Sequence, residues 1–435
     1  MDTSKLKSFA PEVRRNLIEA VGRKLDYVLT ADTPDLRAAS TQVAKLRQQS
    51  SDPTERSKLI EQVSYTWFNR LAALRFLDAR GWHPFHAKVL MPASPDETQP
   101  ELLKQTRLGT IPDELKTHTN VNRLNDLLIG KLPSLDAQGE VYRHLLLASC
   151  RYYHNLMPFL FEKLDDETEF LLPDDVLTEH SIAHGFRTDI TDEDCSEVEV
   201  LGWLYQFYIS EKKQKVFDDL KKNIKINSEN IPAATQLFTP HWIVRYLVEN
   251  SLGRLWLLNR PDSQLAQKME YYIKPEQPET DFLRINSPEE IKVCDPASGS
   301  GHMLTYAFDL LYAIYEEEGY DPATIPEKIL THNLYGIEID ERAGELAALA
   351  LTLKAREKQR SVFSKGIEPN ICVLENIRFD TIKAADLFNQ SNESANELDA
   401  YMDFVGRNLF TTSLETTLRQ FEEVKNFGSL IRPEI

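Results

Sequence analysis

The residues best suited to chemistry are concentrated in one short turn. Residues 295–301 read Asp-Pro-Ala-Ser-Gly-Ser-Gly and directly follow the apolar run Ile-Lys-Val-Cys. Glycines let a backbone come close to a bound molecule, and the N–H groups that open a helix favour a carboxylate or phosphate. Asp295, at the end of the run, can accept hydrogen bonds from an amine. The pattern therefore favours a ligand that is both an amino acid and a nucleoside.

A second acidic motif, Tyr-Gly-Ile-Glu-Ile-Asp, occupies residues 335–340. A carboxylate at Glu338, near the end of a strand, can bind both hydroxyls of a ribose, and Ile339 can pack on an adenine ring. The spacing is wider than the roughly 20 residues of a compact dinucleotide fingerprint, and the loop at 319–333 accounts for the extra length. The alternative is that Glu338 and Asp340 are solvated charges at a helix start. The two interpretations differ in whether this carboxylate and the glycine turn face one crevice.

The first 230 residues have the periodicity of helices. Apolar residues recur at three-to-four spacing in the stretches 59–82, 141–164 and 200–220, as is typical of amphipathic helices that pack on one another. The many aromatic residues in these stretches are expected to form a core rather than a base-stacking surface. We therefore predict a helical N-terminal domain over residues 1–230.

A different pattern begins at residue 231. Phe-Thr-Pro at 238–240 opens an amphipathic helix, with Thr239 as the predicted N-cap and Pro240 at the first helical position. Strand-like apolar runs and helices then alternate, and this alternation indicates a parallel sheet.

The predicted fold class is α + α/β. The sheet-forming part covers residues 231–380 and is expected to be an incomplete doubly wound, Rossmann-like sheet, with helices to about residue 318 and over 341–359. Residues 381–435 are predicted to be a helical, insertion-like end.

Composition places the chain among globular proteins. Of the 435 residues, 42% are hydrophobic and 27% are charged, and no run approaches the roughly 18 apolar residues of a membrane span. The N-terminus lacks the apolar core of a signal peptide, so we expect a cytoplasmic protein without a membrane partner. The net charge of −18 argues against a protein that coats nucleic acid nonspecifically, although it is compatible with a local DNA-binding patch.

The four cysteines show no Cys-x-x-Cys spacing, so neither a disulfide framework nor a zinc site is expected. Cys294 and Cys372 lie in strand-like apolar runs, where cysteine is usually a small buried residue. His241 and His302 each follow a motif and lack an obvious second metal ligand. We predict no metal site, and we predict that the two strand cysteines are buried.

The motifs occur in an order that resembles a known family. Asp-Pro-Ala-Ser-Gly-Ser-Gly-His-Met-Leu is preceded by Gln-Leu-Phe-Thr-Pro at 236–240 and followed by the acidic motif and by Asn-Ile-Cys-Val-Leu-Glu-Asn-Ile-Arg-Phe at 370–379. This arrangement resembles the S-adenosylmethionine-binding half of the gamma-type DNA adenine N6-methyltransferases. The helical N-terminus and the phrase at 421–433 further resemble the PglX methyltransferases of BREX phage-defence systems. Four motifs in order are specific, whereas Asp-Pro-Ala alone is not, because it recurs at 321–323 without glycines.

The resemblance implies S-adenosyl-L-methionine as the cofactor and assigns roles by position. It implies that Thr239 contacts the methionine carboxylate and that the turn at 295–301 wraps the methionine end. It also implies that Glu338 holds the ribose, with Ile339 against the adenine. The resemblance implies that the catalytic residues belong to another motif of the family and not to these four.

The adenine amine of the cofactor is usually met by an acidic residue in the third motif. The run Leu-Glu-Asn-Ile offers either Glu375 or Asn376, and we prefer Asn376 because it falls at the end of the strand. The cofactor-binding residues implied by the resemblance are Phe238, Thr239, Asp295, Pro296, Ala297, Gly299, Gly301, Glu338, Ile339 and Asn376.

The motif that performs methyl transfer in this family does not occur in the sequence. An adenine amine is a poor nucleophile, and the family activates it with Asn/Asp-Pro-Pro-Tyr/Phe, whose carbonyls accept the amine hydrogens while the ring stacks on the flipped base. No such tetrapeptide is present in the 435 residues. The sequence therefore supplies no candidate catalytic residues, and we expect no methyl transfer by this chain alone.

We expect the chain to be part of a longer methyltransferase, a split gene product, or a module completed by another polypeptide, and the first of these fits best. Without a fourth strand, the first strand would be an exposed edge. The implied partners are double-stranded DNA, in the full-length enzyme, and a C-terminal remainder or other phage-defence proteins. The alternative function is a non-catalytic scaffold with a vestigial cofactor pocket.

Overall fold

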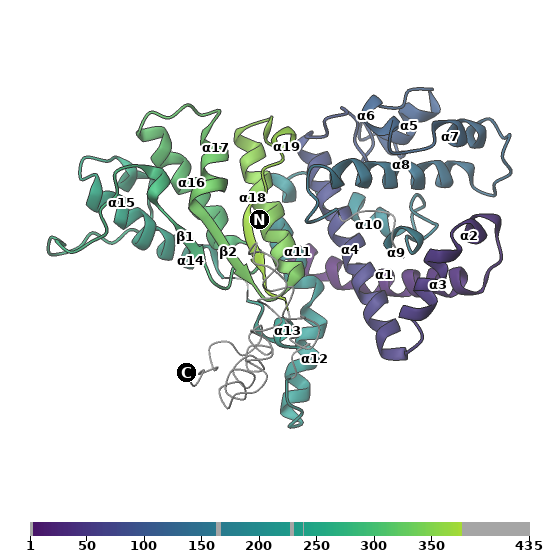
Figure 1. The fold of residues 1–435 in the computed structure, drawn as a ribbon, viewed down its shortest axis with the longest axis horizontal. Coiled ribbons are helices and arrows are strands. Elements are labelled where there is room, and N and C mark those ends of the chain that lie inside the picture. The colour runs from purple at the N-terminus through teal and green to yellow at the C-terminus, as the bar shows by residue number, and fades with distance from the viewer. Residues whose placement is uncertain (1–2, 162–166, 227–229, 238, 376–435) are drawn as a thin grey trace, which may run out of the picture.

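The computed structural model describes residues 3–161, 167–226, 230–237 and 239–375. The predicted segment 381–435 lies outside the described residues, as do Phe238 and Asn376. The described chain forms two lobes side by side, one made of helices and one built around a parallel sheet (Figure 1). No helix among the described residues is long and apolar enough to cross a membrane.

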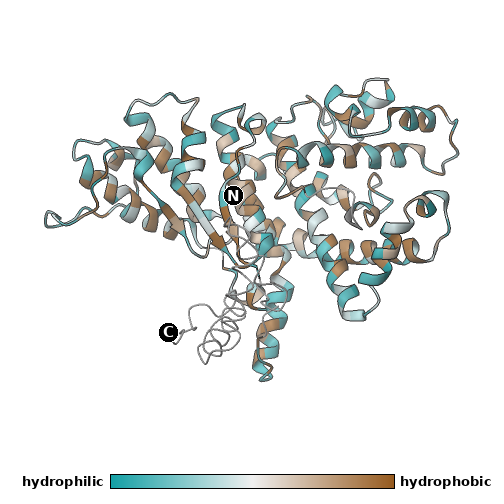
Figure 2. Cartoon of the chain, in the orientation of Figure 1, coloured by the Kyte–Doolittle hydropathy of each residue, from teal (hydrophilic) through white to brown (hydrophobic). Residues whose placement is uncertain are grey.

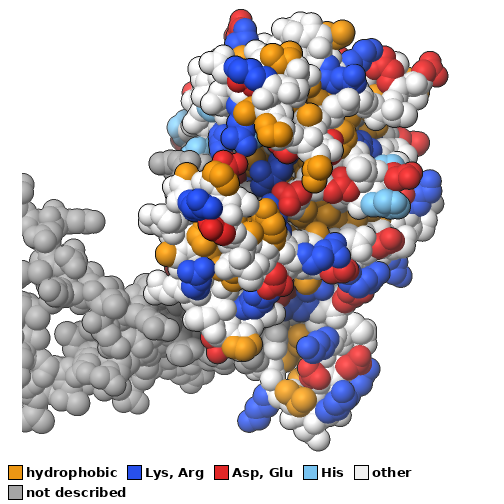
Figure 3. Space-filling model, turned by 90° about the vertical axis from the view of Figure 1, so that its right-hand side faces the viewer, with side chains coloured by type: hydrophobic (Ala, Val, Ile, Leu, Met, Phe, Trp, Pro, Cys, Tyr) orange, Lys and Arg blue, Asp and Glu red, His pale blue; other side chains and the backbone are white. Residues whose placement is uncertain are grey.

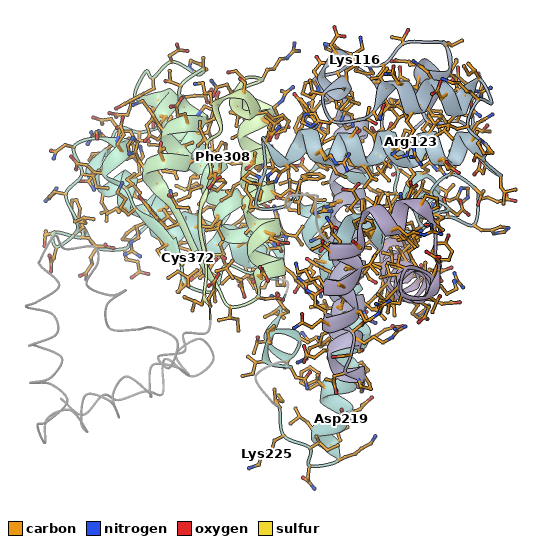
Figure 4. All side chains as sticks on the ribbon, turned by 45° about the vertical axis from the view of Figure 1, so that its right-hand side comes forward. Lys116, Arg123, Asp219, Lys225, Phe308 and Cys372 are labelled. Atoms are coloured by element: carbon orange, nitrogen blue, oxygen red, sulfur yellow. The ribbon has the colours of Figure 1, made fainter. Side chains whose placement is uncertain are left out.

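The helical lobe is built by the first half of the chain, as its periodicity predicted. Its helices are α1 (Ser4–Thr30), α2 (Pro34–Ala38), α3 (Ser40–Gln49), α4 (Pro53–Arg80), α5 (Glu101–Arg107), α6 (Asp113–Lys116), α7 (Val121–Leu128), α8 (Ala137–His154), α9 (Glu167–Phe170), α10 (Ile182–Thr188), α11 (Glu199–Tyr208) and α12 (Ser210–Lys221). Figure 4 shows α12 projecting away from both lobes, with Asp219 near its end and Lys225 beyond it. On the end face of this lobe, basic and acidic side chains are intermixed (Figure 3).

Helix α4 shows how local sequence sets the limits of an element. The Asp52 carboxylate accepts hydrogen bonds from the N–H groups of Thr54 and Glu55 at 2.8 and 3.2 Å, and Pro53 occupies the first turn. At the other end Gly81 adopts the left-handed conformation with φ 61°, as is common after a helix. Between these caps the helix buries large aromatic side chains such as Trp67, which confirms that the aromatic residues form a core.

The second lobe contains three parallel strands and the helices between them. Its elements are α13 (Ile231–Thr235), α14 (His241–Val248), α15 (Arg254–Asn259), β1 (Val293–Asp295), α16 (His302–Glu317), α17 (Ile325–Lys328), β2 (Leu334–Glu338), α18 (Glu341–Lys358), α19 (Val362–Lys365) and β3 (Asn370–Val373). The strand order is β1-β2-β3, so β1 lies at an edge of the described sheet. The predicted alternation of strands and helices is confirmed, while the completion of a doubly wound sheet remains a prediction.

Helix α18 belongs to the cores of both lobes. Leu346 and Leu353 pack within the apolar core of the helical lobe, whereas Leu351 and Ala355 pack in the core beneath the sheet. Figure 1 shows α18 between the sheet and α11. Because one helix is buried on both sides, the two lobes are joined by a shared apolar element.

The two faces of the sheet have different environments. Side chains alternate between the faces, and the face that includes Leu334 and Glu338 is buried against helices. On the opposite face Cys294 and Cys372 are exposed, and Cys372 is labelled in Figure 4. Apolar residues line this face as well (Figure 2). The prediction that these cysteines are buried was therefore wrong, because no described residue covers their face.

The start of α14 also differs from the prediction. The helix begins at His241, and Pro240 occupies the N-cap without a side-chain hydrogen bond. The first helical hydrogen bonds run from the N–H groups of Ile243 and Val244 to the Pro240 carbonyl at 2.9 and 3.2 Å. Thr239 therefore lies one residue before the cap, and its proposed role at a ligand does not compete with helix capping.

Candidate cofactor site

The two predicted motifs meet at the carboxyl ends of β1 and β2. The strands are parallel, with Asp295 opposite Gly336, so their ends lie at the same edge of the sheet. The Ser298 N–H donates to the Ile337 carbonyl at 3.0 Å. The Gly299 N–H donates to the Glu338 carboxylate at 2.7 Å. The glycine turn and the acidic residue therefore adjoin directly, at the place where doubly wound sheets bind ligands.

Glu338 is buried, and within the described residues its carboxylate is held by backbone N–H groups. Its side chain accepts hydrogen bonds from the N–H groups of Gly299 at 2.7 Å and of Ile339 and Asp340 at 3.0 Å each. Burial raises the pKa of Glu338, although these hydrogen bonds oppose the shift. A carboxylate offers about four lone-pair sites, so three N–H donors leave one site for a hydroxyl of a ligand.

The two glycines of the turn have different surroundings. Gly299 and Gly301 both have positive φ, 54° and 87°, a conformation that other residues rarely adopt. A Cβ on Gly301 would lie 3.1 Å from the Cα and Cβ of Ala347 in α18. A Cβ on Gly299 would have only the Gln236 Oε1 within 4 Å, at 3.9 Å. Gly301 thus permits close packing with α18, whereas a Cβ on Gly299 would make only an ordinary van der Waals contact within the described chain.

Asp295 shapes the beginning of the turn. Its carboxylate accepts a hydrogen bond from the Ala297 N–H at 3.1 Å, and burial raises the pKa of Asp295. Asp321 forms the same turn with the Ala323 N–H at 2.9 Å, far from the site and with no strand before it. The Asp-Pro-Ala tripeptide therefore encodes a local turn, and only the preceding strand and following glycines distinguish the site. Pro296 and Ala297 themselves are exposed.

The segment before α14 reaches the same place. Gln236 is the residue nearest to the open side of Gly299, and Thr239 follows it by three positions and is partly buried. The rings of His241 and Tyr306 pack edge to face with centroids 6.2 Å apart, which joins the starts of α14 and α16. The glycine turn and Glu338 therefore lie at one end of the sheet, and Gln236 brings the segment before α14 close to them.

Other residues at this site had no signal in the sequence pattern. The Tyr205 hydroxyl in α11 donates to the Asp340 carboxylate, and Gly202 lies against Ser300 and His302. Both come from the helical lobe, and their helical periodicity predicted only burial. The contacts could not be found from local motifs, since Tyr205 and Asp340 are 135 residues apart.

Comparison with known proteins agrees with this geometry. A family model described as "MmeI, DNA-methyltransferase domain" matches residues 282–372, which contain β1, β2, the glycine turn, Glu338 and all of β3 except its last residue. The match places a region similar to a methyltransferase domain over the strands that carry the candidate site.

Two curated proteins resemble nearly the whole chain. The adenine-specific methyltransferase BrxX of Escherichia coli O9:H4 (strain HS) is 37% identical over 99% of this chain and 38% of its own length. The adenine-specific methyltransferase PglX of Lacticaseibacillus casei (strain Zhang) is 33% identical over 85% of this chain and 34% of its own length. The family resemblance predicted from the motifs is confirmed: the chain is a homologue of these adenine-specific methyltransferases. It spans well under half of the length of each.

Proposed function

We propose that this chain is the N-terminal and cofactor-binding portion of an adenine-specific (N6) DNA methyltransferase of a BREX phage-defence system. The observation that carries the proposal is the contact between the Gly299 N–H and the Glu338 carboxylate. It brings a glycine turn and a ribose-binding type of residue to the carboxyl ends of neighbouring parallel strands, where a nucleoside cofactor fits. The homologues support the choice of reaction.

In this proposal S-adenosyl-L-methionine lies across the ends of β1 and β2. The turn from Asp295 to Gly301 holds the methionine end, and Thr239 contacts its carboxylate. Glu338 binds a ribose hydroxyl through its remaining lone-pair site, and Ile339 packs on the adenine. Asn376 meets the adenine amine, as the third motif implies.

Methyl transfer requires groups that we propose are supplied by another part of a longer protein or by a partner. Because the sequence holds no Asn/Asp-Pro-Pro-Tyr/Phe motif, it has no identified acceptor for the hydrogens of the target adenine amine. We therefore propose that the chain binds cofactor without methylating DNA alone. Double-stranded DNA is then the substrate of the completed enzyme, whose target base must leave the helix to be reached.

A second candidate is a non-catalytic scaffold with a vestigial pocket. The observation in its favour is that Glu338 is 6% exposed and its carboxylate already accepts three backbone hydrogen bonds. A carboxylate satisfied in this way gains less from a ribose than a free one would. The two candidates differ in whether the cofactor binds.

Calorimetric titration of the purified chain with S-adenosylmethionine tests the proposal. We expect binding, and we expect Glu338→Ala and Asp295→Ala to weaken it at least about tenfold, since each removes charged hydrogen-bonding capacity. Asp321→Ala is the matched control, because it removes the same turn outside the site, and it should leave the affinity unchanged.

The outcomes separate the two candidates. Absence of binding by the wild-type chain favours the scaffold. Binding with equal affinity in all three variants contradicts the assignment of the site. Incorporation of labelled methyl groups into DNA by the chain alone would contradict the proposal that the activating groups lie elsewhere.

A further inference from the structure

Helix α11 of the helical lobe touches both halves of the candidate cofactor site. Gly202 and Tyr205 are three residues apart on α11 and therefore lie on one face of the helix. Gly202 lies against the glycine turn at residues 300–302, and Tyr205 contacts the acidic motif at Asp340. One helix face thus spans the two turns that are proposed to hold opposite ends of the ligand.

The contact on the methionine side depends on the absence of a side chain. A Cβ on Gly202 would lie 2.6 Å from His302 Cε1 and 2.7 Å from Ser300 Oγ, both closer than real Cβ contacts. The backbone of α11 therefore packs directly on the residues that flank Gly301. Any bulk added at Gly202 must displace the side chains of Ser300 and His302 from their positions beside Gly301.

The contact on the nucleoside side is a continuous chain of hydrogen bonds. The Tyr205 hydroxyl donates to the Asp340 carboxylate, the Asp340 N–H donates to the Glu338 carboxylate at 3.0 Å, and the Glu338 carboxylate also accepts from the Gly299 N–H at 2.7 Å. Tyr205 is 3% exposed, so water cannot readily replace its hydroxyl. Losing that hydroxyl would leave one Asp340 oxygen without its donor and free the 338–340 turn to move.

A second residue of the helical lobe supports the same turn. The Tyr65 hydroxyl donates to the Arg342 carbonyl at 3.2 Å, and the Arg342 guanidinium lies 4.7 Å above the Tyr65 ring. The other oxygen of Asp340 accepts from the Arg342 N–H at 3.2 Å and caps α18. The start of α18 is therefore fixed from the helical lobe, and the acidic motif immediately before it is fixed with it.

We propose that α11 is a positioning element of the cofactor site, in which Tyr205 sets the nucleoside side and Gly202 sets the methionine side. Neither residue touches the reacting atoms. This inference rests on the proposed function, because it concerns the same site. It makes cofactor affinity dependent on how the helical lobe packs against the sheet lobe, so that the N-terminal helices form part of the cofactor-binding unit.

Two ligands that differ at one end can test this division. S-adenosylhomocysteine carries both the nucleoside and the amino-acid ends, whereas 5′-methylthioadenosine lacks the amino-acid end. We expect Tyr205→Phe to weaken both ligands by the same factor, about tenfold, because the nucleoside side is common to them. We expect Gly202→Ala to weaken S-adenosylhomocysteine by about tenfold or more and to leave 5′-methylthioadenosine unchanged.

The chain offers a matched control for each substitution. Tyr208→Phe removes a buried hydroxyl on the same helix that has no hydrogen-bond partner in the described chain. Gly22→Ala adds a Cβ to another helix, where the nearest atom lies 3.7 Å away. Both controls should bind both ligands as the wild type does, and melting temperatures should be measured for all four variants.

The results distinguish a positioning role from a merely structural one. The proposal is overturned if Tyr205→Phe and Gly202→Ala lower the melting temperature but leave both affinities unchanged. It is also overturned if Gly202→Ala weakens both ligands by the same factor. If the wild-type chain binds neither ligand, both the proposed function and this inference are contradicted. If the wild-type chain binds and the variants bind with the same affinity, only this inference is contradicted. Should Gly202→Ala fail to fold, the comparison of Tyr205→Phe with Tyr208→Phe still tests the positioning role, because Tyr205→Phe adds no atoms to the packed interface.

Discussion

Replacing Gly301 by alanine should destabilise the sheet lobe through two separable effects. The residue has φ 87°, and a Cβ there would lie 3.1 Å from backbone and side-chain carbons of Ala347. Gly319 provides a matched comparison, because it has φ 80° and a Cβ there would have no atom within 4 Å. Gly319→Ala therefore measures backbone strain alone, and Gly301→Ala measures strain together with crowding against α18.

The expected magnitudes follow from these surroundings. A left-handed conformation costs a non-glycine residue about 1–2 kcal/mol, which is the expected loss of unfolding free energy in Gly319→Ala. Crowding of a packed interior adds about 1–3 kcal/mol. Gly301→Ala should therefore lose about 2–5 kcal/mol in all. Ala347 cannot retreat easily, since α18 is packed on both sides.

Urea unfolding followed by tryptophan fluorescence and circular dichroism measures the difference. Trp256 is fully buried in the core of the sheet lobe and reports on that lobe. Equal losses in Gly301→Ala and Gly319→Ala would refute the packing argument. Gly299→Ala should resemble Gly319→Ala in stability, because the nearest described atom to its Cβ would be Gln236 Oε1 at 3.9 Å, and should instead show its effect in cofactor binding.

Two further predictions concern acid stability and thiol exposure. Although burial acts in the opposite direction, hydrogen bonds led by that from Lys328 lower the pKa of Glu289 to about 2. Wild type should therefore be more stable than Glu289→Gln above pH 4.5, and the gap should close as the pH falls towards 2, in unfolding curves measured across that range. A constant gap would contradict the assignment. In the native chain Cys294 and Cys372 should react with a chromogenic disulfide reagent. The buried Cys150 and Cys195, whose thiol pKa burial raises to about 12, should react only after unfolding. Reaction of all four thiols at one rate would contradict the exposure described.

Much of the sheet lobe could be predicted from sequence because its signals are local. The predicted helices to about residue 318 and over 341–359 correspond to α16 and α18, which end at Glu317 and Lys358. The position of Glu338 at the end of β2 was also predicted correctly. Strand runs, glycine turns and helix starts depend on neighbouring residues, so they remain visible without the rest of the molecule.

The wrong predictions concern properties that neighbouring residues do not determine. Cys294 and Cys372 lie in apolar strands yet are exposed, because burial depends on what covers a sheet face and not on the strand itself. Thr239 has the right residue type for a cap, but α14 begins after Pro240. Helix ends fray, so local sequence fixes a helix boundary only to within a residue or two.

By itself the sequence determined the order of the motifs, the turn chemistry of residues 295–301 and the alternation of strands and helices, since all of these arise within short stretches of chain. Only the tertiary structure decided that Glu338 is bound by the Gly299 N–H and that α11 lies against both turns. The physical reason is that such contacts form when α18 is buried by both lobes at once, a packing arrangement that no local pattern specifies.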